Sequence, residues 1–469
     1  MTLALLCVAQ FVDVLGVTIV ITALPSIQRG LSFPGQDLHW VVSIYALFFG
    51  GFIMLTGRAA DLYGRRRMFM GGLVLFACAS LAAGLANAPA FLVIARAAQG
   101  LGAAVVVPAA LSILTTTFSE GAARSRALGI WTAAGAGGGA AGFFLGGLIT
   151  GTLDWRWVFL INVPVAAIGA VLAPMLLRES RAAAATRRLD LGGGVTATAA
   201  FLALIYGFTR VQDAGIGSSF AWGSLVLGIL LLLSFAFIEQ RAEDPLLPSG
   251  VFRSRNLVGA NIVAFLITGL TSPAAVIGTL YLQRVREYSP TAAGLTYMPS
   301  SLLVVVGSLV GARLIVKSGA RFTMVSGVVA VGVSLILMAS ISVGEGLGFL
   351  VAGIALSGFG LGCASVASTA AGTSTASDED QGLVSGLLNT AAQLGTAIGI
   401  ALLVTVATAR TTDLSGSGEA TASSLVGGFH LAFHVAAGIA AAGAVIAIVL
   451  VPKRSPSAAR TDRGVPPSA

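Results

Sequence analysis

The stretch GRAADLYGRRRMF, residues Gly57 to Phe69, is a charged segment between two long apolar runs. Gly57 and Gly64 carry no side chain, so they allow two helix ends to approach closely. The arginines at 65–67 place charge where the hydrocarbon of a bilayer would exclude it. Asp61 is suited to pair with an arginine or to neutralise a helix N-terminus. A topology signal alone would explain the arginines, but it leaves Asp61 and the two glycines unexplained.

The composition around this stretch is that of a membrane protein. Of 469 residues, 56% are hydrophobic and only 10% are charged, and the mean hydropathy is +0.93. Soluble proteins carry about 25% charged residues. Apolar segments of about 20 residues, the length that crosses a bilayer as a helix, recur along the chain. We therefore predict an all-α membrane protein with 14 spans. The expected spans are 3–25, 40–57, 68–86, 89–116, 126–150, 156–177, 191–209, 220–238, 257–281, 294–316, 321–342, 346–372, 382–407 and 427–451.

The basic residues predict the orientation of these spans. With the N-terminus in the cytoplasm, twenty of the 27 Lys and Arg residues fall on the cytoplasmic side, six on the other side, and Arg96 within a span. This asymmetry places both termini in the cytoplasm. The net charge of +8 is then a topology signal, and no nucleic-acid partner is expected. The first apolar segment lacks a basic leader, so we expect it to remain as the first helix.

An internal echo predicts two halves. GARLIVKSGAR, residues 311–321, follows an apolar run as Gly57 to Arg67 does, although it lacks an acid. Such an echo is expected when two six-helix halves derive from one repeat. We expect six-helix bundles at 1–177 and 256–451, an inserted hairpin with cytoplasmic linkers at 178–255, and a disordered tail at 452–469. The three cysteines lie in apolar spans, so neither a disulfide framework nor a metal site is expected.

Six motifs in order resemble the major facilitator superfamily, and within it the fourteen-helix drug:proton antiporters. The resemblance extends over nearly the whole chain. The matching stretches are GRAADLYGRRRMF (57–69), RAAQGLGAA (96–104), WRWVFLINVP (155–164), LDLGG (189–193), YSPTAAG (288–294) and GLLNTAAQLGTAIG (386–399). The resemblance implies the major facilitator fold and places the loop at 57–69 at a cytoplasmic gate, with Gly57, Asp61, Gly64, Arg65 and Arg66 as its elements.

The chain departs from the family pattern at two positions. In the first helix the family carries an acid just before Thr-Ile-Val, where this chain has Gly16, and its acid is Asp13, three residues earlier. One helical turn separates the two positions, so we expect Asp13 to serve on nearly the same face. In the fifth helix the family's Gly-Pro appears as Gly142-Phe143, which removes a proline kink.

Asp13 and Arg96 are the residues expected to carry proton coupling. An unpaired carboxylate within a span costs about 2.5–3.5 kcal/mol on insertion scales, so Asp13 should face a cavity or a partner. Arg96 is the natural partner, although it also has the length to snorkel outward. A hydrogen-bonded acid that only locks helix packing is the alternative for Asp13.

Other polar and small residues suggest further roles. Gln99 extends the polar path from Arg96, and Asn389 and Gln393 place two amides on one helix face, as substrate contacts or as interhelical hydrogen bonds. These three residues are our candidates for a polar substrate cavity. Gly138, Gly142 and Gly146 form a small-residue seam, which we expect to seal the two halves together. For His430 and His434 we expect a structural role with no metal.

Three functions compete on this sequence. The first is a proton-coupled exporter of amphipathic or weakly cationic drugs or antibiotics that works by alternating access. The second is an uncoupled facilitator of a small organic solute, which Gly16 and Phe143 favour. The third, a membrane enzyme or sensor, lacks any recognisable catalytic set. The resemblance implies a monomer in the plasma membrane that uses the proton gradient, with no cofactor, and with a small molecule, protons and lipid as its partners.

Overall fold

The computed structural model describes residues 1–33, 38, 40–119, 121–180, 191–214, 218–241, 254–344, 346–374, 376, 380–416 and 421–452. In this part of the chain all regular structure is helical. The helices are α1 (Thr2–Leu31), α2 (Trp40–Tyr63), α3 (Arg65–Gly84), α4 (Pro89–Thr117), α5 (Ala122–Thr152), α6 (Trp157–Leu160), α7 (Asn162–Leu176), α8 (Leu191–Ala214), α9 (Ser219–Glu239), α10 (Arg255–Leu280), a π-helical turn (Tyr281–Val285), α11 (Pro290–Thr296), α12 (Met298–Met338), α13 (Gly348–Thr373), α14 (Gln381–Ser415) and α15 (Ala422–Leu450).

Twelve helices of the described chain are long and apolar enough to cross a membrane. This count does not confirm the expected fourteen. Two places account for the difference: α8 has an apolar stretch of only 17 residues, Gly192–Phe208, and α12 counts as one helix of 41 residues. Within α12, Gly319 has the non-helical angles φ 84° and ψ 162°, so the chain bends there.

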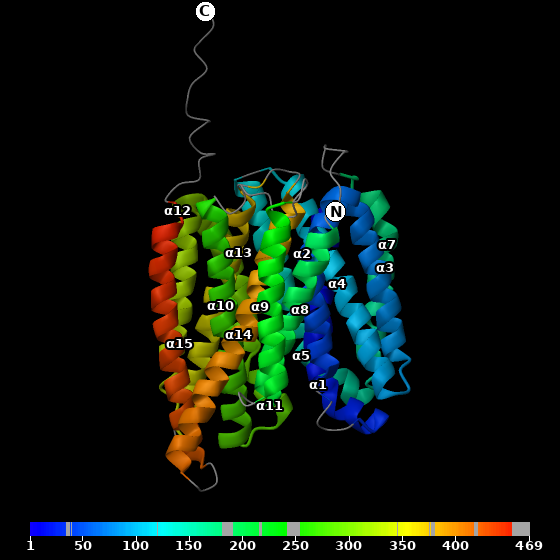
Figure 1. Cartoon of the computed structure of the whole chain (residues 1–469). Coiled ribbons are helices and arrows are strands. Elements are labelled where there is room, and N and C mark those ends of the chain that lie inside the picture. The colour runs from blue at the N-terminus through cyan, green and yellow to red at the C-terminus, as the bar shows by residue number, and fades with distance from the viewer. Residues whose placement is uncertain are drawn as a thin grey trace, which may run out of the picture.

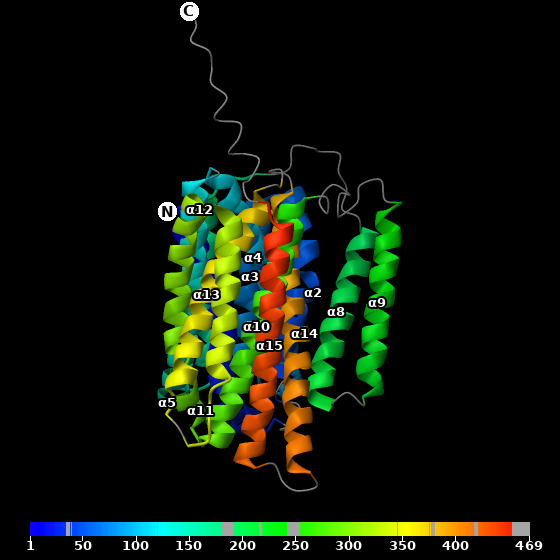
Figure 2. The same ribbon diagram turned by 90° about the vertical axis from the view of Figure 1, so that its left-hand side faces the viewer.

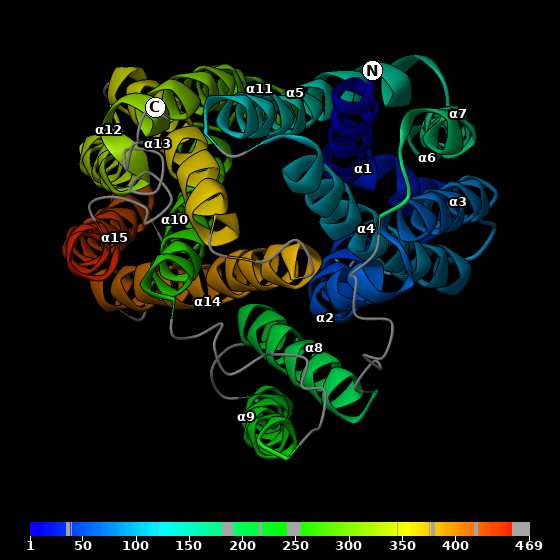
Figure 3. The same ribbon diagram turned by 90° about the horizontal axis from the view of Figure 1, so that it is seen from above.

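The helices form two groups with a hairpin outside them (Figure 3). One group contains α1 to α7, and the other contains α10 to α15. Two pairs pack across the boundary, α2 with α14 and α5 with α12. The hairpin of α8 and α9 stands beside the bundle, where α8 packs against both α2 and α14 (Figure 2). The expected linkers and tail lie largely outside the described residues, at 181–190, 242–253 and 453–469.

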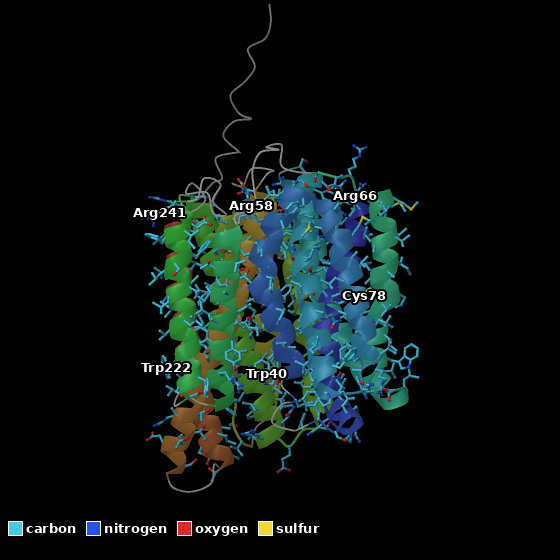
Figure 4. The ribbon with its side chains drawn as sticks, turned by 45° about the vertical axis from the view of Figure 1, so that its right-hand side comes forward. Trp40, Arg58, Arg66, Cys78, Trp222 and Arg241 are labelled. Atoms are coloured by element: carbon cyan, nitrogen blue, oxygen red, sulfur yellow. The ribbon has the colours of Figure 1, made fainter. Side chains whose placement is uncertain are left out.

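The N-terminus and the C-terminal end of α15 lie at the same end of the bundle (Figure 1). Because α1 runs away from this end and α2 returns to it, Arg58 and Arg66 lie near this end and Trp40 near the opposite end (Figure 4). We call these the terminal end and the distal end.

The internal echo has a structural counterpart in the two loops. Gly64, which caps α3, has φ 109°, and Gly319 in α12 has φ 84°. Side chains on L-residues disfavour positive φ, so glycine suits both turns. The two related stretches therefore bend at their second glycine, which supports a common origin for them.

Candidate functional site: two acids and a central cavity

Asp61 is fully buried at the terminal end of α2 and joins three other parts of the structure. Its Oδ1 accepts hydrogen bonds from Arg65 Nε at 3.1 Å and Nη2 at 3.0 Å, and from Ser112 Oγ of α4 at 3.4 Å. The backbone N–H groups of Gly382 and Leu383, in the first turn of α14, donate to its two oxygens at 3.1 Å each. The carboxylate thus occupies the positive end of the α14 dipole and links the two helix groups.

Two further ion pairs surround this contact. Arg58 Nη1 of α2 lies 3.1 Å from Asp380 Oδ1, at the N-terminal cap of α14. Glu179 follows α7, and its Oε2 lies 3.7 Å from Arg66 Nε. Its Oε1 also accepts the backbone N–H of Arg66 at 3.2 Å, near the start of α3. All five predicted gate residues are therefore found at the terminal end, either in these contacts or beside them.

Glycines permit this close packing of α2 against α14. A Cβ on Gly57 would lie 2.4 Å from the carbonyl oxygen of Gly382, and a Cβ on Gly382 would lie 2.3 Å from the carbonyl oxygen of Gly57. Real Cβ atoms do not approach oxygens this closely, so any larger residue would push the helices apart. At Gly64, a Cβ would meet Glu179 Oε1 at 2.8 Å.

Asp13 and Arg96 lie on either side of Tyr45. The Tyr45 hydroxyl donates to Asp13 Oδ1 at 2.6 Å, while the Arg96 guanidinium carbon lies 4.4 Å from the centre of the Tyr45 ring. No direct ion pair between Asp13 and Arg96 is found in the described chain. The expected pairing is therefore corrected: the two charges are connected through a tyrosine, by a hydrogen bond and a cation–π contact.

Arg96 is fully buried, so it does not snorkel to the surface. Its Nε donates to the Val41 carbonyl at 2.8 Å, and its Nη1 donates to Gln99 Oε1 at 2.6 Å. Gln99 Nε2 in turn donates to Ser80 Oγ at 2.8 Å. Gln99 thus extends the polar path from Arg96, as predicted, but the path leads into the bundle toward α3.

Asp13 lies in a small pocket between α1, α3, α4 and α7. The pocket, about 20 Å³, has room for about one water, and its other lining residues are apolar. Phe76 of α3 lines this pocket, and a Cβ on Gly16 would lie 3.6 Å from Phe76 Cζ. Asp13 and Gly16 therefore face the same residue of α3, in agreement with the expectation that they share a helix face.

A larger cavity of about 530 Å³ lies between the two helix groups. Its lining comes from α1 and α5 on one side and mainly from α10, α12, α13 and α14 on the other. Asn389 lines it, as one of our alternatives supposed, although its Nδ2 donates to the Ser385 carbonyl. Neither Gln99 nor Gln393 lines it, so the predicted polar cavity set is only partly brought together.

The glycine seam of α5 packs within one group of helices. A Cβ on Gly138 would lie 2.2 Å from the Phe11 carbonyl oxygen, and Cβ atoms on Gly142 and Gly146 would collide with Thr18 and Thr22. All three contacts are with α1. The expectation that this seam joins the two halves is corrected: these glycines bring α5 onto its neighbour, while Gly129 and Ala312 make the close contact between α5 and α12.

The remaining predicted residues contact groups outside the central cavity. His430 Nε2 lies 2.6 Å from the Ile341 carbonyl oxygen, and His434 Nδ1 lies 2.7 Å from that of His430. Gln393 packs against Gly50 of α2. The described residues contain no cluster of three or more metal-ligating side chains.

Sequence reasoning missed several important residues. Tyr45 lies in an apolar run without a motif, and neither Glu179 nor Asp380 was linked to the gate because both partners are distant in sequence. One signal was available: Asp380 lies directly before the amide-rich stretch that starts α14, where an acid suits a helix N-terminus.

Comparisons with known proteins place this arrangement among transporters. The chain is 37% identical to the puromycin resistance protein of Streptomyces alboniger, over 98% of this chain and 92% of that protein. It is 39% identical to the cephamycin export protein of Amycolatopsis lactamdurans, over 86% and 84% of the two chains. The tetracenomycin C resistance and export protein of Streptomyces glaucescens is 31% identical over 88% of this chain and 77% of its own.

A solved structure shows the same fold. The human organic anion transporter MFSD10 superposes with a TM-score of 0.70 at 16% identity, over 95% of this chain and 98% of that one. The profile of the Major Facilitator Superfamily matches residues 6–400. This multi-pass membrane protein therefore belongs to the Major Facilitator Superfamily of transporters.

Proposed function

We propose that this protein exports antibiotics or similar drugs out of the cell in exchange for protons. The observation that carries the proposal is the cavity of about 530 Å³ between two helix groups. At the terminal end the two groups are joined by the contact of Asp61 of α2 with the first turn of α14. A cavity between two groups, blocked at one end, is the arrangement that alternating access requires. Relatives of similar length are named as resistance and export proteins.

The orientation follows from the charges. Arg58 and Arg66 lie at the terminal end, and Trp40 and Trp222 lie toward the distal end (Figure 4). Positive residues favour the cytoplasmic side, and tryptophans favour a membrane interface. We place both termini in the cytoplasm and the protein in the plasma membrane. The cavity includes Tyr297, which directly follows α11 at the distal end (Figure 1), so we propose that it faces outward in this conformation.

The architecture that we propose has fourteen crossings. It counts α8 as a crossing, since it runs beside α9, and divides α12 at Gly319. Residues 1–177 and 256–451 then form two six-helix bundles around an inserted pair, α8 and α9. We propose a monomer without a cofactor.

Asp13 is our candidate for the proton site, positioned by Tyr45 and Arg96. Its carboxylate has a single hydrogen-bond donor in the described structure, Tyr45, and a pocket for about one water. Protonation of Asp13 would remove a negative charge from a membrane span, where a charged group is costly, and would therefore change the electrostatic energy of the site. No redox or covalent chemistry is needed.

An uncoupled facilitator is the second candidate. It is favoured by one observation: Asp13 lines the small pocket and not the central cavity. For the proton-coupled exporter, this position means that coupling must act through α1, which contributes Gln10 and Val14 to the cavity on either side of Asp13.

The two candidates differ in their response to a collapsed proton gradient. Cells that express the protein should tolerate more of at least one compound in a panel of puromycin, a cephamycin, lincomycin and tetracenomycin C than cells with an empty vector. Adding a protonophore should restore intracellular accumulation. Efflux that persists under the protonophore supports the facilitator, and unchanged tolerance to every compound contradicts export of this class.

A further inference from the structure

The central cavity has no formal charge among the described residues that line it. Asp13 and Arg96 both lie outside its lining, and its polar groups are hydroxyls, amides and an indole. A charge that leaves water without a counter-ion loses several kcal/mol of solvation, because the interior has a low dielectric constant. The lining therefore discriminates against a permanent ion.

The two walls of the cavity differ in polarity. The wall from α10, α12, α13 and α14 carries nine of the hydroxyl or amide residues: Thr268, Thr279, Tyr297, Ser300, Ser301, Ser365, Ser368, Thr369 and Asn389. The wall from α1, α4 and α5 is less polar, and we call it the apolar wall: it carries Gln10, Thr18 and Thr132, and otherwise glycine, Ala136, Val14, Leu111 and the ring of Trp131. A ligand that fills the space thus meets a more polar surface on one side and a less polar surface on the other.

Five of the eight hydroxyls of the polar wall donate their hydrogens within the protein. Thr268 Oγ1 donates to the Ala392 carbonyl at 2.7 Å, Thr369 Oγ1 to that of Ser365 at 2.9 Å, and Tyr297 Oη to that of Ala275 at 2.8 Å. Each oxygen keeps lone pairs that can accept a hydrogen bond. The polar wall is therefore rich in acceptors and suits a ligand that presents N–H or O–H donors.

The apolar wall contains two buried polar atoms without a hydrogen-bond partner. They are Gln10 Oε1 of α1 and Trp131 Nε1 of α5. A Cβ on Gly135, one turn from Trp131, would lie 3.1 Å from Gln10 Nε2, so the two side chains occupy the same region of this wall. An unpaired buried group costs about 1–3 kcal/mol, and an uncharged ligand with an N–H and a carbonyl has the groups to satisfy one of each kind.

We infer that the cavity binds its substrates in an uncharged form, with hydrogen-bond donors toward the Ser/Thr-rich wall and an aromatic or apolar face toward Trp131. This inference rests on the proposed export function and defines the substrate class of that site. It replaces the weakly cationic drugs of the sequence-based expectation, because the acid that would pair with a cation does not line the cavity.

Three probes with one ring skeleton test the inference. Acridone is uncharged and has an N–H donor, N-methylacridone is uncharged without a donor, and 10-methylacridinium is a permanent cation. Their fluorescence is titrated with the purified full chain in nanodiscs, with empty nanodiscs as the blank. We expect acridone to bind about threefold to tenfold more tightly than N-methylacridone. N-methylacridone should bind at least about tenfold more tightly than 10-methylacridinium.

A matched pair of variants locates the effect. Asn389→Asp adds a carboxylate to the cavity wall, and Gln393→Glu makes the same amide-to-acid change one turn away, outside the lining. Asn389→Asp should raise the affinity for 10-methylacridinium by about tenfold or more, because an opposite charge is then within reach. Gln393→Glu should leave that affinity within about twofold of wild type.

The outcomes separate this inference from the function on which it rests. Equal binding of 10-methylacridinium and N-methylacridone by the wild type overturns the uncharged class, as does an equal response of the two variants. Binding of none of the probes overturns the assignment of this cavity. Export of the antibiotic panel is measured independently in cells, so the result of these titrations does not decide whether the protein exports antibiotics.

Discussion

The two acids Asp61, which is buried, and Asp13, which is half-buried, have opposite surroundings. Asp61 accepts five hydrogen bonds from Arg65, Ser112 and the first turn of α14, whereas Asp13 accepts one from Tyr45. A carboxylate with several hydrogen-bond partners on different helices fastens the elements around it. An acid with one partner and a water-sized pocket is free to change its protonation state. The difference assigns a structural role to Asp61 and the proposed proton-carrying role to Asp13.

The largest expected effect comes from removing the charge of Asp61. Asp61→Asn removes the carboxylate that pairs with Arg65, which is only 2% exposed, and breaking a buried ion pair costs about 3–5 kcal/mol. The α2–α14 contact should open. Electron-spin distance measurements between labels at Tyr63 and Lys317, both exposed, should show a longer, broader distribution.

The control for this variant is Asp413→Asn. Asp413 pairs with Arg410 on the surface, where ion pairs contribute about 0–1 kcal/mol, so its removal should leave the label distance unchanged. Equal distances in wild type and Asp61→Asn would show that Asp61 does not hold the end closed.

A smaller effect on the same contact is expected from Gly57→Ala. The added methyl would meet the Gly382 carbonyl oxygen at 2.4 Å, and such overpacking costs about 1–3 kcal/mol. The same spin labels should report partial opening. Gly71→Ala in α3 meets nothing within 4 Å and serves as the matched control. An indistinguishable distance in both alanine variants would show that the close glycine contact is not needed to keep this end closed.

Tyr45→Phe tests the Asp13 side of the comparison. The variant keeps the ring against Arg96 but removes the hydrogen bond to Asp13, an interaction with a charged acceptor worth about 1.5–3 kcal/mol. Proton-driven efflux should slow by about tenfold or more, with unchanged spin-label distances at the terminal end. Tyr281→Phe, which removes a hydrogen bond to the Ser342 carbonyl, is the control. Wild-type efflux in Tyr45→Phe would contradict a role for this contact in coupling.

The smallest effect is expected at the rim of the closed end. Asp380→Asn weakens the contact with Arg58, but the Asp380 side chain is 19% exposed, so solvent and neighbouring groups compensate. The loss should be about 1 kcal/mol. Its label distance should lie between those of wild type and Asp61→Asn; opening as wide as in Asp61→Asn would mean that the rim, and not Asp61, closes this end.

The sequence predicted what depends on local pattern. Apolar length identified the membrane helices, and the glycines and charges at 57–69 identified the closed end. It mislocated features that depend on which helices meet. The glycines of α5 face α1, and Asp13 reaches Arg96 through Tyr45. Periodicity shows that residues share a face but not which helix that face meets, and no motif marks Tyr45. The span count stays unconfirmed at Gly319, where a local glycine bend joins two expected spans into one helix of 41 residues.

The most direct test of the account is pH-gradient-driven transport in proteoliposomes containing wild type or Asp13→Asn. The antibiotic that gives the largest tolerance in cells serves as substrate. Wild type should accumulate it when a proton gradient is imposed. Asp13→Asn should lose this response, yet it should still equilibrate substrate down its own gradient, because the cavity and the Asp61 contact are unchanged. An Asp13→Asn variant that accumulates substrate as wild type does would contradict the central claim.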